Sequence, residues 1–172
     1  MLCSIHINPH LIDEGYSIRI FMQEKETHQK ELIDIAKLAL KPYGFKKINS
    51  KWTLKKEGIT FIFTISKSWG DQYNIYCSIK VKHNEEEIWV AQPPIQRYLT
   101  DETNQYFVNF HPPYNRTETY KKDLELAIYN FGAAVKKINS FEDLRHHLVD
   151  DLKIDSSSFS AKARPLFFDN NS

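Results

Sequence analysis

Histidines and acidic residues near the C-terminal end of the chain are the first candidates for chemistry. His146 and His147 adjoin Asp150 and Asp151, and on a helix His146 and Asp150 would share one face at the i, i+4 spacing. That spacing suits zinc, but a zinc site needs three or four converging ligands. The sequence has no H-E-x-x-H motif and no cysteine pair to complete the set. We therefore expect a solvated helix face, and we predict no metal and no cofactor.

Nucleophilic catalysis has no better support in the sequence. There is no G-x-S-x-G motif and no glycine-rich phosphate loop, and the chain has only five glycines. Cys77 falls on the apolar side of an alternating run, where a thiol acts as a small hydrophobic group. An enzyme site assembled from dispersed residues such as His111, Asp101 or Glu102 stays open as an alternative. We assign no catalytic residue.

Lysines are distributed unevenly, although the formal net charge is only +1. Residues 37–82 hold ten lysines against Glu57 and Asp71, a local balance of +8, so the rest of the chain sums to −7. Such asymmetry indicates a binding surface. His111 lies in a second candidate region, a loop stiffened by Pro112 and Pro113. The candidate binding residues are Lys51, Lys55, Tyr76, Lys80, Lys82, His111 and Tyr114.

The elements that would position these residues follow from hydrophobic periodicity. Residues 25–43 carry an apolar stripe at helical spacing, and Gly44 is a natural helix end because glycine adopts the left-handed conformation easily. Residues 59–66 and 73–82 alternate apolar with polar side chains, which predicts an antiparallel sheet with one wet face. Further strands are expected at 51–56, 88–91 and 105–110.

Two helices are expected after the strands. The first runs from Thr117 or Thr119 to about Ile138, and the second begins at Ser140, whose partner in a capping box would be Asp143. Strands flanked by helices, rather than alternating with them, predict an α+β fold. We expect an antiparallel sheet of about five strands, with one face covered by an N-terminal helix and two C-terminal helices.

One domain accounts for most of the chain. Residues 1–22 are predicted to be an N-terminal extension or an extra strand pair, with Met22 as an alternative start. Residues 23–155 form the single α+β domain, and residues 156–172 form a polar tail that is either docked or loose. The sequence shows no signal peptide and no membrane-spanning run, and we expect reduced cysteines and a cytoplasmic protein.

The first predicted helix ends in the sequence Leu-Lys-Pro-Tyr-Gly-Phe-Lys-Lys over residues 40–47. Trp52 and a strand pair rich in Phe and Ile follow it. This region resembles the bacterial domain of unknown function 4304 family. The resemblance covers residues 25–82 and, in shape only, residues 117–152. It implies a helix-flanked antiparallel sheet and hints at small accessory or immunity-type proteins of bacteria, but it transfers no catalytic residue.

Three hypotheses for function follow. The first is a non-enzymatic protein-binding module, of immunity or antagonist type, that acts through its sheet face or the 92–114 loop. The alternative is a nucleic-acid-binding accessory protein that uses lysines on the sheet. Sheet-based RNA readers stack bases on two or three exposed aromatic residues, and Tyr76 is the only clear one in the alternating pattern. The third is the enzyme with a dispersed site.

Overall fold

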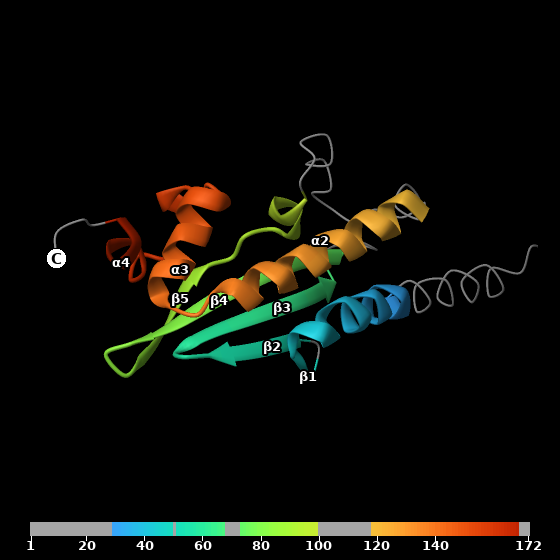
Figure 1. Cartoon of the computed structure of the whole chain (residues 1–172), viewed down its shortest axis with the longest axis horizontal. Helices are drawn as coiled ribbons and strands as arrows, with labels where there is room; N and C mark the ends of the chain where they lie inside the picture. The colour runs from blue at the N-terminus through green and yellow to red at the C-terminus, as the bar shows by residue number, and fades with distance from the viewer. Residues whose placement is uncertain (1–28, 50, 68–72, 100–117, 169–172) are drawn as a thin grey trace, which may run out of the picture.

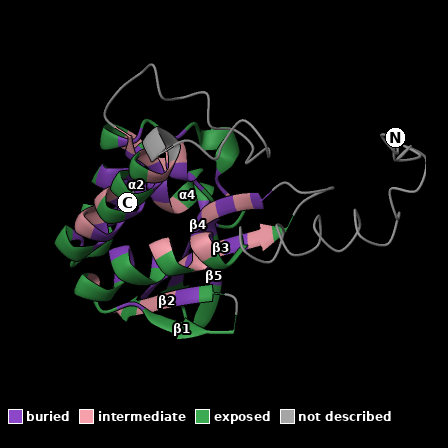
Figure 2. Cartoon of the chain, turned by 90° about the vertical axis from the view of Figure 1, so that its right-hand side faces the viewer, coloured by how far each residue is buried: buried purple, intermediate pink, exposed green. Residues whose placement is uncertain are grey.

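The computed structural model of the chain describes residues 29–49, 51–67, 73–99 and 118–168. These residues form an α+β fold, as predicted, in which an open antiparallel sheet of five strands is packed against helices. Figure 1 shows the helices in front of the sheet, and the turned view in Figure 2 places them to one side of the strands. The fold therefore has two layers.

The sheet is a simple meander, in which each strand pairs with the next one in the chain. Two of its turns contain two residues with positive φ, Glu57 with Gly58 and Asn84 with Glu85. Such pairs match the twist of neighbouring strands and give tight hairpins. The strands are β1 (Lys46–Ile48), β2 (Lys51–Lys56), β3 (Ile59–Lys67), β4 (Tyr73–His83) and β5 (Glu86–Ala91).

The predicted strands are found with two differences. β5 begins at Glu86 rather than residue 88, because the Asn84–Glu85 turn closes the hairpin earlier. β1 was not predicted, because a strand of three exposed residues has no alternating apolar pattern. The strand expected at 105–110 lies outside the described residues, as does the segment 1–22.

The helices follow the predicted spacing closely. The first helix covers residues 29–40 and continues as a 3-10 turn, η1 (Lys41–Tyr43), because Pro42 cannot donate a backbone hydrogen bond. Gly44 ends it with a φ of 82°, as expected. α2 (Glu118–Lys137) lies beside this helix and runs in the same direction (Figure 1). The two are also joined by an ion pair between Lys121 and Glu31 at 3.6 Å.

The C-terminal part is built from shorter elements. α3 (Phe141–His146) begins with the predicted capping box, in which Asp143 N donates to Ser140 Oγ and Ser140 N donates to Asp143 Oδ2, both at 3.0 Å. A π-helical turn, η4 (His147–Asp151), extends it. The remaining short helices are η2 (Ile95–Tyr98), η5 (Ser156–Ser158) and α4 (Arg164–Phe168).

One hydrophobic core lies between the sheet and the helices. Aromatic rings link the layers: Phe131 of α2 lies 5.5 Å from Phe45 and 6.1 Å from Phe63, measured between ring centroids. Trp52 meets Phe63 edge-on at 5.7 Å. The largest fully buried side chains include Phe61, Phe63, Phe131, Phe167, Leu32, Leu40, Ile79, Ile128, Leu144 and Leu148.

The segment after residue 155, for which docking was left open, is packed onto the domain up to residue 168. Phe159, Ala163 and Phe167 are buried. Phe159 forms a β-bridge with Ala91 on the outer edge of β5, and Ser160 N donates to the Val90 carbonyl at 2.9 Å. This segment thus covers an edge that would otherwise expose unpaired backbone groups.

No helix among the described residues is long and apolar enough to cross a membrane.

Candidate functional site

The face of the sheet turned away from the helices is the main candidate surface, and we call it the open face. Directly paired residues of antiparallel strands point to the same side, so the register defines this face strand by strand. Its members are Lys46, Ile48, Lys51, Thr53, Lys55, Thr60, Ile62, Thr64, Ser66, Asn74, Tyr76, Ser78, Lys80, Lys82, Glu87 and Trp89.

All five sheet residues among the predicted binding residues lie on this face. Lys51 and Lys55 of β2 are exposed, while Tyr76 of β4 is half-buried. Lys80 and Lys82 follow on the same strand. The period-two alternation was therefore sufficient to bring them together. His111 and Tyr114 lie outside the described residues, and so do Asp101 and Glu102.

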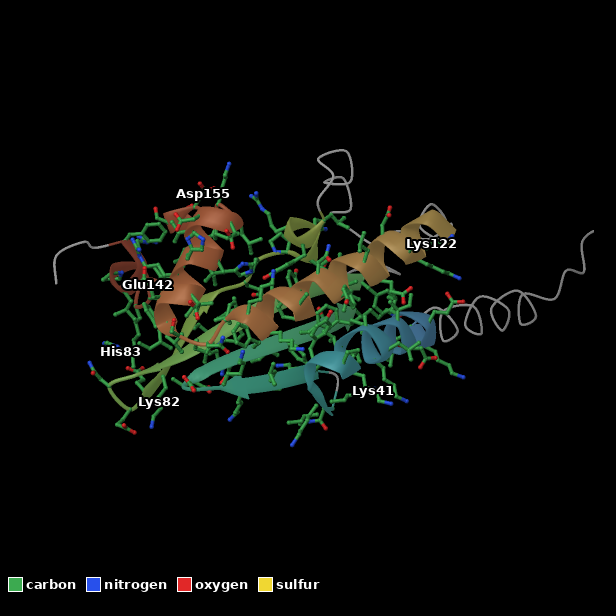
Figure 3. The ribbon with its side chains drawn as sticks, in the orientation of Figure 1. Lys41, Lys82, His83, Lys122, Glu142 and Asp155 are labelled. Carbon is green, nitrogen blue, oxygen red and sulfur yellow. The ribbon has the colours of Figure 1, made fainter. Side chains whose placement is uncertain are left out.

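The lysines of β4 are engaged by glutamates of the β4–β5 hairpin. Lys80 Nζ lies 2.7 Å from Glu87 Oε2 and also stands over the Trp89 ring at 5.1 Å from its centroid. Lys82 Nζ lies 2.5 Å from Glu85 Oε2. The hydrogen bond from Lys80 is the main cause that lowers the pKa of Glu87. Figure 3 shows Lys82 at the tip of this hairpin, away from the body of the molecule. These pairs nearly neutralise this part of the open face.

The lysines of β1 and β2 are different. Among the described residues, Lys46, Lys51 and Lys55 form no ion pair and no side-chain hydrogen bond, and only Lys55 acts at longer range, where its charge helps to lower the pKa of Glu87. Lys51 and Lys55 are about 13 Å apart along β2, at roughly 3.3 Å per residue. Lys46 is paired with Thr53, midway between them. The open face therefore has a cationic half at β1 and β2 and a charge-balanced half at β4 and β5.

Apolar side chains on the open face were partly missed by sequence reasoning. Trp89 is 46% exposed and Ile48 is 60% exposed. The signal for Trp89 was available, since Ile88 and Val90 are the apolar positions of β5 and Trp89 falls between them. Ile48 belongs to the unpredicted β1. Both residues could contact a partner, and Trp89 is a second aromatic residue on the face besides Tyr76.

The two histidines near the C-terminal end each contact an aspartate four residues later in the chain. His146 Nδ1 lies 2.8 Å from Asp150 Oδ2, as the i, i+4 spacing predicted, and His147 Nδ1 lies 3.2 Å from Asp151 Oδ2. The solvated face predicted here holds for His146, whose side chain is 66% exposed. It is wrong for His147, which is 9% exposed because it lies three residues after the fully buried Leu144, on the same core-facing side. Within the described ranges, no group of three or more ligating residues is arranged for a metal.

Cys77 is fully buried on the helix-covered face of β4, as predicted. Burial raises the pKa of its thiol well above the ordinary value, so the thiolate needed for nucleophilic attack is disfavoured. Cys77 in turn acts on buried Tyr98, whose pKa is raised by burial first and by Cys77 second. The arrangement is that of a packed core and not of an activated nucleophile.

No protein-family model matches the chain, and no curated protein or solved structure shows a significant similarity to it. The resemblance to the domain of unknown function 4304 family stays an expectation.

Proposed function

We propose that the protein is a non-enzymatic binding module that holds a protein partner on its open face. The observation that carries this proposal is the unequal division of the sheet: the N-terminal helix and α2 lie on one face. The other face carries exposed Ile48 next to the unpaired lysines of β1 and β2, and exposed Trp89 on β5 at the opposite edge. Exposed aromatic residues within a polar surround are typical of protein interfaces.

The charge distribution supports a protein rather than a nucleic acid. A polyanion lying across all five strands would meet cations at Lys51 and Lys55 but carboxylates at Glu85 and Glu87, which already neutralise Lys82 and Lys80. A protein surface can place acidic groups opposite β1 and β2 and neutral or basic groups opposite the hairpin. We therefore infer a partner whose contact surface is acidic where it meets β2.

The nucleic-acid alternative keeps one supporting observation, the second aromatic residue on the face. Trp89 and Tyr76 together would reach the number on which sheet-based RNA readers stack bases. Against it, the Trp89 ring is already covered on one side by Lys80. Binding of this kind would fall steeply with salt.

The test is affinity capture from lysate of the source organism, with nuclease added, using the protein and two charge-reversed variants. Lys51→Glu with Lys55→Glu reverses the cationic half, and Lys122→Glu with Lys136→Glu makes the same charge change on exposed positions of α2. We expect one stoichiometric protein to be lost with the first variant and kept with the second. Capture that disappears on nuclease treatment would transfer the assignment to nucleic acid.

An antagonist role of immunity type is the finer form of this proposal, and it is supported by the resemblance stated above. It predicts that the captured partner is a toxin whose activity the protein blocks. Inhibition of that partner in a purified assay, abolished by Trp89→Ala but not by Leu126→Ala on α2, would support it. Binding without any change in the partner's activity would contradict it.

A further inference from the structure

Two buried side chains that each carry an unpaired polar atom lie next to each other between η2 and the π-helical turn, away from the open face. The Tyr98 side chain is 5% exposed and the His147 side chain faces it, with ring centroids 5.8 Å apart and planes inclined by 34°. Tyr98 Oη and His147 Nε2 are both fully buried, and neither has a hydrogen-bond partner in the described part of the chain. An orphaned polar atom in a protein interior costs about 1–3 kcal/mol, so native structures nearly always satisfy it.

The hydrogen-bonding roles of the two atoms are complementary. His147 Nδ1 contacts the Asp151 carboxylate at 3.2 Å, and a carboxylate can only accept, so Nδ1 carries the proton. His147 Nε2 is therefore an acceptor in the neutral ring. Burial lowers the pKa of His147, which favours that neutral form. The Tyr98 hydroxyl supplies a donor and has lone pairs to accept.

Fully buried side chains pack around Tyr98. Phe131, which is fully buried, lies edge-on to Tyr98 at 5.2 Å between ring centroids. Cys77 is also fully buried. Above the Tyr98 backbone, Asn130 Nδ2 donates to the Tyr98 carbonyl at 2.9 Å, which fixes η2 against α2. A group that joins the two atoms has to accept from Tyr98 Oη and donate to His147 Nε2.

We propose that Tyr98 and His147 form a binding site for one internal water molecule, which accepts from Tyr98 Oη and donates to His147 Nε2. Buried waters make roughly two to four hydrogen bonds to otherwise unsatisfied groups, and the two described here lie within that range. The water bridge connects η2 to the π-helical turn. It requires the His147 tautomer that Asp151 selects, with the proton on Nδ1. The site couples two segments that are far apart in the chain and share no backbone hydrogen bond.

Long-range ¹H–¹⁵N NMR on histidine-labelled protein at neutral pH tests the tautomer and the bridge. His147 should show a protonated Nδ1 and an unprotonated Nε2 whose shift is that of a hydrogen-bonded acceptor, with a water cross-peak at the ring. A protonated Nε2, or an Nε2 shift of a free acceptor, would overturn the proposal.

Tyr98→Phe removes one arm of the bridge, and Tyr129→Phe, on the exposed side of α2, is the matched control. We expect the water cross-peak and the bound Nε2 shift to be lost in Tyr98→Phe and kept in the control. A crystal structure of the unmodified protein should show one solvent peak within hydrogen-bond distance of both atoms. A direct bond between Tyr98 and His147, or an unchanged Nε2 shift in Tyr98→Phe, would contradict a shared water.

Discussion

At the scale of single residues, His147 is the position where the structure departs from the sequence-based prediction of a solvated face, and its burial affects stability. It is buried beside Tyr98, with Asp151 at its Nδ1 and His146 as the neighbouring titratable group. Desolvation lowers its pKa below the ordinary 6.5, although Asp151 acts in the opposite direction. The unfolded chain therefore binds the proton more readily than the folded protein does.

This difference makes stability depend on pH. The contribution of His147 is complete above pH 6.5 and is lost as the pH falls below that value towards the folded-state pKa, at up to about 1.4 kcal/mol per pH unit. We predict that His147→Gln flattens the loss of unfolding free energy between pH 7 and 5. His146→Gln, at an exposed position, should keep the wild-type slope in urea titrations. Equal slopes in all three proteins would show that His147 is not the group responsible.

Gly132 is a second residue whose role depends on a neighbour far away in the sequence. A Cβ at this position would lie 2.1 Å from Cδ2 of Tyr43, so the Tyr43 ring occupies the space of the missing side chain. The ring also lies 5.3 Å from Tyr129, and burial with the hydrogen bond to Tyr129 raises the pKa of Tyr43 to about 12. Glycine is thus required here for packing and not for backbone conformation.

We predict that Gly132→Ala lowers the unfolding free energy by about 1–3 kcal/mol through overpacking. In a Tyr43→Ala background the same substitution should instead raise it by about 0.5–1 kcal/mol, because alanine is the better helix former. Chemical denaturation of the four proteins gives the sign directly. Stabilisation by Gly132→Ala in the presence of Tyr43 would contradict the close packing.

At the scale of elements, a lysine from the sheet completes the end of α2. Four acceptors lie within hydrogen-bond distance of Lys56 Nζ, whose three N–H groups they share: the carbonyls of Val135 at 3.2 Å, Lys136 at 3.0 Å and Ile138 at 2.6 Å, and Asn139 Oδ1 at 3.0 Å. The last carbonyls of a helix have no partner within the helix and carry partial negative charge. Lys56 satisfies them and attaches the helix to β2.

We predict that Lys56→Met lowers the unfolding free energy by about 1–2 kcal/mol, because the helix-end carbonyls lose their charged donor. The loss stays this small because water weakens hydrogen bonds that are partly exposed. Lys55→Met, on the open face of the same strand, should change it by less than about 0.5 kcal/mol. Thermal and urea unfolding of both variants would measure the difference. Equal effects would mean that the cap contributes nothing beyond a surface lysine.

At the scale of the whole molecule, the domain extends past the point where the sequence pattern ends. Phe167 is 1% exposed and packs against Phe141 at 4.8 Å and Phe159 at 5.0 Å between ring centroids. Arg145 Nε also donates to the Phe167 carbonyl at 2.9 Å. Residues 156–168 are therefore part of the folded unit rather than an appended tail.

We predict that Phe167→Ala destabilises the protein by about 3–5 kcal/mol, the cost of a large cavity in a core. Ser157→Ala, at an exposed position of the same segment, should be nearly neutral. Calorimetry of both variants distinguishes a docked segment from a loose one. A melting temperature unchanged by Phe167→Ala would show that the segment does not stabilise the fold.

The sequence by itself determined the features that depend on local periodicity. The alternation over residues 51–56, 59–66 and 73–82 assigned Cys77 to the core and Lys51, Lys55, Tyr76, Lys80 and Lys82 to one face, because strand side chains alternate strictly. Gly44 and the Ser140–Asp143 box marked helix ends for the same reason, since capping acts over three or four residues.

Only the tertiary structure decided which of these residues are available to a partner. It pairs Lys80 and Lys82 with glutamates, leaves Lys51 and Lys55 unpaired, assigns Lys56 to the end of α2 and buries His147 and Phe167. These outcomes depend on side chains brought together from distant segments, as with Lys56 and Ile138, which are 82 positions apart in the sequence. The local sequence pattern does not predict such long-range contacts, because they depend on how distant segments pack and on which side chains that packing buries.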